Sequence, residues 1–309
     1  MEKPDVQDDT RAGQDAPAAV LRLASGVTLA LVRAPAGEFL MGGTEAEVEQ
    51  VFAAASQAYA KGERDRLTPE RRAWFTRELP QHPVQLAAYL MGQHPVTVAQ
   101  FAAFVQASGY RTTAEKEGSG HTWTGREWKD VQGADWQRPR GPDSDVKSKA
   151  DHPVTQVSWH DALAFCTWAS QATGRTVRLP SEAEWEKAAR GTDARLYPWG
   201  TQAPDGTRCN FNMEVTDTTP VGKYSPAGDS PYGCADMAGN VWEWTGSLFQ
   251  AYPYRPDDDR EDISGSRPRV VRGGSWFIFH RRVRCSYRDW HYPLCRDSDL
   301  GFRVCASPI

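Results

Sequence analysis

The chain has 309 residues, of which 39% are hydrophobic and 25% charged, and this composition favours a globular protein over a disordered or membrane-embedded one. Its formal net charge of −4 argues against a dedicated nucleic-acid binder, which needs a basic surface. The sequence holds 12 Trp beside 26 Gly and 21 Pro, so we expect a loop-rich fold in which indole rings supply much of the packing.

Residues 1–19 are polar, acidic and contain proline, which predicts a disordered N-terminal tail. They have neither the basic start nor the apolar stretch of an export signal, and no run approaches the ~18 apolar residues of a membrane helix. We therefore expect a cytoplasmic protein without a membrane span. Its six cysteines are expected to be reduced thiols.

The first half of the chain predicts a hairpin followed by helices. Residues 20–42 alternate apolar and polar side chains around Ser-Gly and Ala-Gly turns, which indicates a β-hairpin. Residues 44–79 are rich in Ala, Glu and Arg and predict a helical insertion. Three further helices each have a hydroxyl N-cap and a glycine stop. These pairs are Thr97 and Gly109, Ser158 and Gly174, and Ser181 and Gly191.

Beyond residue 192 the sequence indicates turns and short strands, with a charged surface loop at 252–269. No linker separates this part from the helices, so residues 20–309 are expected to form one domain. The predicted fold class is α+β, a loop-rich domain with few short strands and about three helices.

A series of motifs resembles the formylglycine-generating enzyme family, also called sulfatase-modifying factors. They include HPVTVAQFAAFV, RLPSEAEWEKAARG, YGCADMAGNVWEWT, RVVRGGSW and LGFRV, in the family's order. The resemblance implies a C-type-lectin-like fold for the domain. Because one fold hosts many activities, it does not by itself imply the family's chemistry.

The family's oxidase converts a cysteine in a sulfatase peptide to formylglycine with a copper(I) ion held by two cysteines. The resemblance places these cysteines shortly after the Arg-Gly-Gly-Ser motif, where this chain has Ile278 and Val283. Soft Cu(I) needs thiolate or thioether ligands, and neither side chain supplies one. Copper is therefore not expected, unless Cys285 and Cys295 meet as displaced ligands.

The segment GCADMAGNVWEW resembles the family's calcium-binding loop. The resemblance implies ligation by the carboxylates of Asp236 and Glu243 and the carbonyls of Gly239 and Val241. Ca²⁺ prefers hard oxygen ligands, and alternating carboxylates and carbonyls on a Gly-bent loop supply them. Such an ion would be structural. The other interpretation is that Asp236 caps a turn and Glu243 meets an arginine such as Arg272.

Residues 276–299 correspond to the ligand-facing segment of the family's fold. Aromatic and Arg residues concentrated on one surface are typical of binding hot spots. We expect Trp276, Val283 and Tyr287 to be core residues. The candidate ligand-binding residues are Phe277, Ile278, Phe279, His280, Asp289, Trp290, His291, Tyr292, Asp297 and Asp299.

A second resemblance concerns the variable proteins of diversity-generating retroelements, which share this fold and diversify the same segment. Phe277, Ile278, Phe279 and His280 are all reachable by randomising the first two bases of an asparagine codon, although Trp290 is not.

Three hypotheses about function remain. The first is a non-catalytic module that binds a protein, peptide or small-molecule ligand through residues 276–299. The second is an oxidoreductase that converts a substrate cysteine to formylglycine or performs a related thiol oxidation. The third is an accessory subunit whose partner supplies the activity. The loss of the copper cysteines favours the first, so we assign no catalytic residue.

Overall fold

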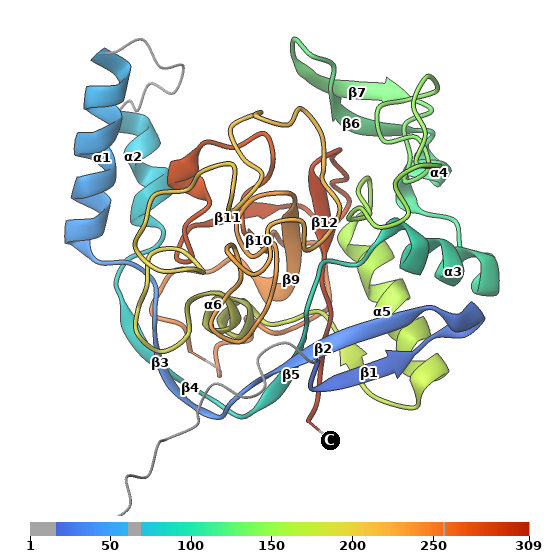
Figure 1. Ribbon diagram of the computed structural model, residues 1–309, viewed down its shortest axis with the longest axis horizontal. Coiled ribbons are helices and arrows are strands. Elements are labelled where there is room, and N and C mark those ends of the chain that lie inside the picture. The colour runs from blue at the N-terminus through green and yellow to red at the C-terminus, as the bar shows by residue number, and fades with distance from the viewer. Residues whose placement is uncertain (1–16, 61–68, 256, 309) are drawn as a thin grey trace, which may run out of the picture.

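The computed structural model describes residues 17–60, 69–255 and 257–308. Residues 1–16 of the predicted tail lie outside these ranges, and strand β1 (Ala19–Arg22) begins at the last residue of that tail. Small sheets and helices alternate along the described chain (Figure 1), which confirms the α+β class. No helix in the described ranges is long and apolar enough to cross a membrane.

The N-terminal hairpin is shorter than predicted. β1 pairs with β2 (Thr28–Ala34), whereas β3 (Gly37–Met41) leaves them and pairs with β4 (His82–Leu86). Gly37 has a φ of 136°, a region that glycine reaches without steric cost, and the chain changes direction there. The Ala-Gly turn therefore starts a second small sheet instead of extending the hairpin.

Two larger sheets organise the domain. One has the order β1-β2-β5-β13-β8, in which β5 is Tyr89–Gly92, β8 is Val177–Arg178 and β13 is Cys305–Ala306. The other has the order β11-β10-β9-β12, with β9 at Trp242–Leu248, β10 at Arg269–Arg272, β11 at Arg288–His291 and β12 at Leu300–Phe302. Every residue of β9 and β10 is buried, so the second sheet lies in the interior.

The three capped helices form where their start and stop signals predict. They are α3 (Val98–Ser108), α5 (Trp159–Thr173) and α6 (Glu182–Arg190). Each begins with a capping box, because the hydroxyl at the N-cap accepts the N3 amide hydrogen bond and the N3 side chain accepts the N-cap amide in return. Each ends at the predicted glycine. The described chain has six α-helices rather than about three, because the insertion contributes two and α4 (Thr113–Glu117) adds another.

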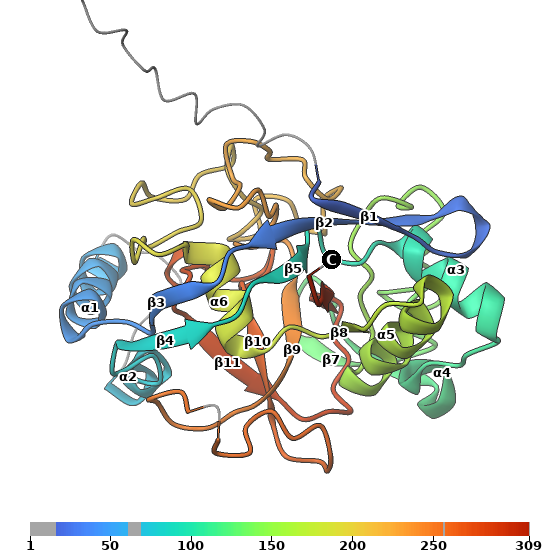
Figure 2. The same cartoon turned by 90° about the horizontal axis from the view of Figure 1, so that it is seen from below.

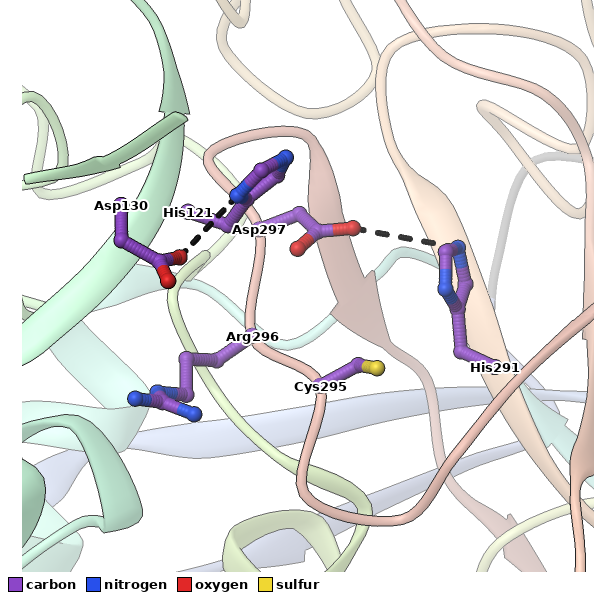
Figure 3. A pocket seen from close by; sticks show the side chains of 6 residues that line it. All are labelled: His121, Asp130, His291, Cys295, Arg296 and Asp297. Carbon is purple, nitrogen blue, oxygen red and sulfur yellow. Dashed lines mark hydrogen bonds and ion pairs between the residues drawn. The ribbon is translucent and has the colours of Figure 1, made fainter. Parts of the chain in front are cut away.

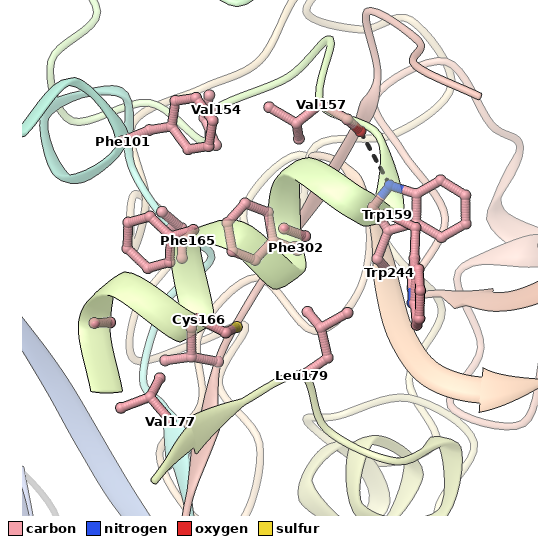
Figure 4. Close-up of a cluster of buried hydrophobic side chains, with 14 of the residues drawn as sticks. Phe101, Val154, Val157, Trp159, Phe165, Cys166, Val177, Leu179, Trp244 and Phe302 are labelled. Atoms are coloured by element: carbon pink, nitrogen blue, oxygen red, sulfur yellow. Dashed lines mark hydrogen bonds between the residues drawn. The ribbon is translucent and has the colours of Figure 1, made fainter. Parts of the chain in front are cut away.

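The main hydrophobic core lies between α3, α5 and the sheets (Figure 4). Phe165 of α5 contacts the rings of Phe101 and Phe302, with centroid distances of 6.1 and 5.4 Å. The buried indole of Trp244 donates to the Val157 carbonyl at 3.0 Å. Because an unpaired buried N–H costs about 1–3 kcal/mol, this bond lets a tryptophan serve as core. Trp276, Val283 and Tyr287 are also buried, as predicted.

The helical insertion consists of α1 (Glu45–Ala60) and α2 (Pro69–Thr76), with residues 61–68 outside the described ranges. In Figures 1 and 2 it lies at the opposite end of the molecule from α3. Phe75 of α2 contacts the ring of Tyr287 at 5.5 Å, and Glu78 forms a buried ion pair with Arg284 at 2.5 Å. The insertion is therefore fixed against the C-terminal segment.

Candidate functional site

Two adjoining cavities lie between residues 276–299 and the hairpin of β6 (Ser119–Trp123) and β7 (Trp128–Gln132). Their volumes are 310 and 220 Å³, and both are lined by His121, His291 and Asp297. Ligand pockets commonly enclose about 300–1,000 Å³, so the pair has the size of a small-ligand site. We call the two cavities together the groove; Figure 3 shows the larger one.

Backbone pairing holds the β6–β7 hairpin against the C-terminal segment. The amide of His121 donates to the Arg296 carbonyl at 3.0 Å, and the amide of Ser298 donates to the His121 carbonyl at 3.0 Å. His121 therefore forms a parallel bridge with Asp297. This pairing places two segments that are far apart in the sequence on the two sides of the groove.

Aromatic rings form one wall of the groove. Phe277 contacts the rings of Trp123 and Trp128 at centroid distances of 4.8 and 5.1 Å. The ring of Trp128 stacks on that of His121 at 5.7 Å with an interplanar angle of 13°. Such ring pairs add stability beyond the area they bury, so the wall is rigid.

Two carboxylates form the acidic side of the smaller cavity. Asp299 is 4% exposed and accepts a hydrogen bond from the Ser275 hydroxyl at 2.6 Å. The carboxylate of Asp297 lies 3.8 Å from the ring nitrogen Nε2 of His291 (Figure 3). Burial, together with the neighbouring charge of Asp297, raises the pKa of Asp299 to about 7. Burial also raises the pKa of Asp297.

Most other charges around the groove are already balanced. The ion pairs are Asp289 with Arg77 at 3.0 Å and Arg296 with Glu117 at 2.7 Å, and Asp130 contacts the His121 ring at 3.1 Å. Arg282 differs, since its guanidinium lies 4.4 Å from the ring centroid of Trp74 and forms no ion pair with any described residue. Among the described residues, Asp297 and Asp299 therefore form no ion pair with Lys or Arg, and Arg282 forms none with Asp or Glu.

The predicted ligand-binding residues divide between two faces. Those that line the groove are Phe277, Ile278, Asp289, His291, Asp297 and Asp299. Those not found in its lining are Phe279, His280, Trp290 and Tyr292. Side chains alternate along a strand, so β11 directs Asp289 and His291 to one face and Trp290 to the other. There Trp290 contacts the rings of Phe249 and Tyr292.

The sequence analysis missed the contribution of the β6–β7 hairpin. Its residues His121, Trp128 and Asp130 line the groove. The signal was present, because HTWTGREW places alternating aromatic and polar residues around a Thr-Gly turn, which is a hairpin pattern. Trp242, which is 5% exposed, lies in the same lining and was assigned only to the calcium-like motif.

The two positions that correspond to the copper cysteines have different surroundings. Ile278 is half-buried and lines the groove, whereas Val283 is fully buried and packs with Tyr197 and Phe211. The possible substitutes are also separate. Cys285 is fully buried in a core cluster, where burial raises its pKa to about 12, while Cys295 lines the larger cavity.

The six cysteines are free thiols, as expected. No group of three or more His, Cys, Asp or Glu in the described ranges is arranged to hold a metal ion. A pair of cysteines is smaller than such a group, so the expectation that the chain binds no copper stays a prediction.

The calcium-like loop has an acidic pair with unequal surroundings. Glu243 accepts from Arg303 at 2.6 and 2.7 Å and from the Trp185 indole at 2.7 Å. Its arginine is therefore Arg303, not Arg272. Asp236 accepts from the Gly222 amide at 2.7 Å but has no ion pair in the described ranges, and burial raises its pKa to about 6.

A buried carboxylate without a cationic partner suits a hard cation, so Asp236 fits the calcium prediction. Glu243 fits it less well, because its charge is already balanced by Arg303. Calcium ligation by these side chains and by the carbonyls of Gly239 and Val241 stays a prediction.

Comparison with known proteins identifies the family to which the chain is similar. The chain matches the model of the sulfatase-modifying factor enzyme 1-like domain over residues 23–308. A protein named formylglycine-generating enzyme from Thermomonospora curvata is 36% identical over 271 residues, with 75% of this chain and 86% of that protein covered. A Bos taurus protein named inactive C-alpha-formylglycine-generating enzyme 2 is 32% identical over 322 residues, with 93% and 91% covered.

Solved structures share the fold. PvdO from Pseudomonas aeruginosa superposes with a TM-score of 0.66 at 23% identity, covering 94% of this chain and 99% of that one. Treponema denticola variable protein 1 superposes with a TM-score of 0.62 at 22% identity and the same coverage. Both likenesses show the fold. The domain match and the identity to the curated relatives show that this chain belongs to the family of sulfatase-modifying factor enzyme 1-like domains.

Proposed function

We propose that this chain is a non-catalytic, ligand-binding member of its family and that the groove holds a protein, peptide or small-molecule ligand. The observation that carries the proposal is the replacement of both copper cysteines. Ile278 lines the groove but has no electron pair that could bind a metal ion, and Val283 is buried in the core.

The composition of the groove supports binding. Rigid aromatic rings bury area at low cost in conformational entropy, and a few polar groups among them give orientation and specificity. Trp128, Phe277 and Trp242 provide the rings, and Asp297 and Asp299 provide the polar groups. The relative whose name marks it as inactive supports the view that the domain occurs without the oxidase chemistry.

The second candidate function is oxidation of a substrate cysteine or another thiol. It is favoured by the relative named formylglycine-generating enzyme and by Cys295, a half-buried thiol in the lining of the larger cavity. A bound copper ion would supply the oxidative chemistry, but Ile278 and Val283 occupy the positions that correspond to its two cysteine ligands.

A turnover assay separates the two functions. The full chain, loaded with Cu(I), is incubated with a Cys-x-Pro-x-Arg peptide, and loss of thiol mass is followed by mass spectrometry. We expect no conversion and no retained copper. Copper-dependent formation of the aldehyde would overturn the proposal, and its loss in Cys295→Ser would then identify the thiol responsible.

We also propose that residues 276–299 form a diversified segment, as in variable proteins. Phe277 and Ile278 are among the side chains of this segment whose exchange would alter the groove directly. Sequencing the gene in many isolates tests this proposal. Substitutions confined to adenine-derived codon positions would support it, whereas substitutions spread evenly along the chain would refute it.

A further inference from the structure

The smaller cavity combines two carboxylates, those of Asp297 and Asp299, that have no Lys or Arg partner among the described residues. Asp299 is more than nine-tenths buried, and Asp297 has a side chain that is 15% exposed. Neither forms an ion pair with Lys or Arg in the described ranges; their polar contacts are the Ser275 hydroxyl and His291. Arg296 is adjacent in sequence, but its side chain points away from Asp297 (Figure 3) and pairs with Glu117.

Aromatic rings line the same cavity. Trp128 and Phe277 form its wall, and Trp242 belongs to the same lining. The face of an indole or phenyl ring carries partial negative charge and attracts a cation placed over it. Carboxylates and aromatic rings in one cavity therefore favour the same kind of ligand, which is a positively charged organic group.

We propose that this cavity binds a primary ammonium group, carried either by a small amine or by a lysine side chain, between Asp297, Asp299 and the rings of Trp128 and Phe277. An ammonium is a compact charge with three N–H donors, which match carboxylate oxygens. This inference rests on the proposed binding function and names its ligand class. A metal ion is a poorer match, because the described ranges hold no cluster of three or more His, Cys, Asp or Glu around one point.

The raised pKa of Asp299 agrees with the proposal that the cavity binds an ammonium group. Its pKa is raised to about 7 because the carboxylate is buried beside Asp297. An ammonium between the two carboxylates would lower these raised pKa values. The reason is that an opposite charge within ~4–6 Å favours the ionised form of a carboxyl group.

Arg282 lines the cavity as well and carries the opposite sign. Its guanidinium is held over the ring of Trp74, so its position is set by α2 and not by the two carboxylates. The cavity therefore has an acidic side for the ammonium and a basic side that repels it. The ammonium is expected on the side of Asp297 and Asp299.

The test is a titration of the full chain at about pH 8, where Asp299 is ionised. The probe is n-butylammonium, which has the carbon chain of lysine, and 1-butanol is its neutral counterpart. Binding is followed by calorimetry and by tryptophan fluorescence. We expect saturable binding of the amine and at least about tenfold weaker binding of the alcohol. Nα-acetyl-lysine methylamide is titrated in parallel: its binding shows that a peptide can be the source, and binding of butylammonium alone indicates a small amine.

Asp299→Asn and Asp297→Asn should each weaken amine binding about tenfold. Glu127→Gln is the matched control, because it makes the same change in charge on the exposed turn of the hairpin outside the groove lining. A thermal melt of every variant confirms folding, and the more exposed Asp297 serves if the Asp299 variant does not fold.

Equal binding of the alcohol, unchanged affinity in both Asp variants, or no amine binding would overturn the ammonium assignment. These outcomes do not affect the result of the turnover assay, which tests the proposed function separately. A chain that neither converts the peptide nor binds amines would still be the proposed binding protein, with a different ligand. A chain that converts the peptide would refute the proposed function itself.

Discussion

The buried carboxylates of this domain fall into two regions with opposite surroundings. Around α6 and the second sheet, three fully buried acids meet arginines of the fold. The pairs are Glu182 with Arg288 at 2.7 Å, Glu186 with Arg190 at 2.8 Å, and Glu243 with Arg303 at 2.6 Å. In the groove, Asp297 and Asp299 are enclosed by protein but have no arginine partner in the part of the chain that the structure describes. The fold itself completes the first region, and the second is the region that we propose a ligand completes.

The strongest way to break this comparison is to remove a cation from the first region. Arg303→Met should destabilise the protein by about 3–5 kcal/mol, because Glu243 would keep a buried charge without a partner. Unfolding in urea measures the loss. The double variant Arg303→Met with Glu243→Gln should recover most of it, since the charge is then gone. A single variant as stable as the wild type would contradict the structural role given to this region.

In the groove, removal of a charge should increase the stability of the protein instead of lowering it. The folded-state pKa of Asp299 is about 7, above the ordinary value of 3.8, so the native protein holds this proton more tightly than the unfolded chain does. The bound proton of Asp299 therefore adds to the free energy of unfolding at low pH. This contribution is lost as the pH rises from about 4 to about 7.

Asp299→Asn removes this ionisation and keeps a similar shape. Relative to the wild type, the variant should gain roughly 2 kcal/mol of unfolding free energy between about pH 5 and pH 8. Urea titrations of both proteins at the two pH values test this gain. A variant whose advantage is the same at both pH values would show that the charge of Asp299 carries no penalty, and that the groove does not differ from the region around α6.

Local signals account for what the sequence predicted well. The helices α3, α5 and α6 begin and end at the predicted residues, because an N-cap hydroxyl and a C-terminal glycine act within a single turn. The replacement of the copper cysteines by Ile278 and Val283 was predictable for the same reason, because the resemblance to the family assigns these cysteines to single positions after the Arg-Gly-Gly-Ser motif. The family was predictable because several such local motifs follow in order.

The groove was predictable only on one side. Its other side depends on the pairing of His121 with Asp297, a contact that spans more than half of the chain and has no local signature. The sequence also did not tell which face of β11 is turned to the groove, so Trp290 and Tyr292 were included beside Asp289 and His291. The number of helices was underestimated because the insertion was treated as one element.

The smallest effect concerns Arg282, the positive charge that shares the cavity with the two carboxylates. Arg282→Gln should raise the affinity for n-butylammonium about fivefold, because a like charge near the ligand is removed at a partly exposed site where the effective dielectric constant is high. Calorimetry at low and moderate salt measures the change, and added salt should reduce it. Arg126→Gln is the matched control, because Arg126 is exposed on the turn of the β6–β7 hairpin, outside both cavity linings, and its loss should change the affinity little. If both substitutions raise the affinity equally, the effect comes from the net charge of the protein and not from the position of Arg282, and the acidic and basic sides of the cavity would not act as separate sites.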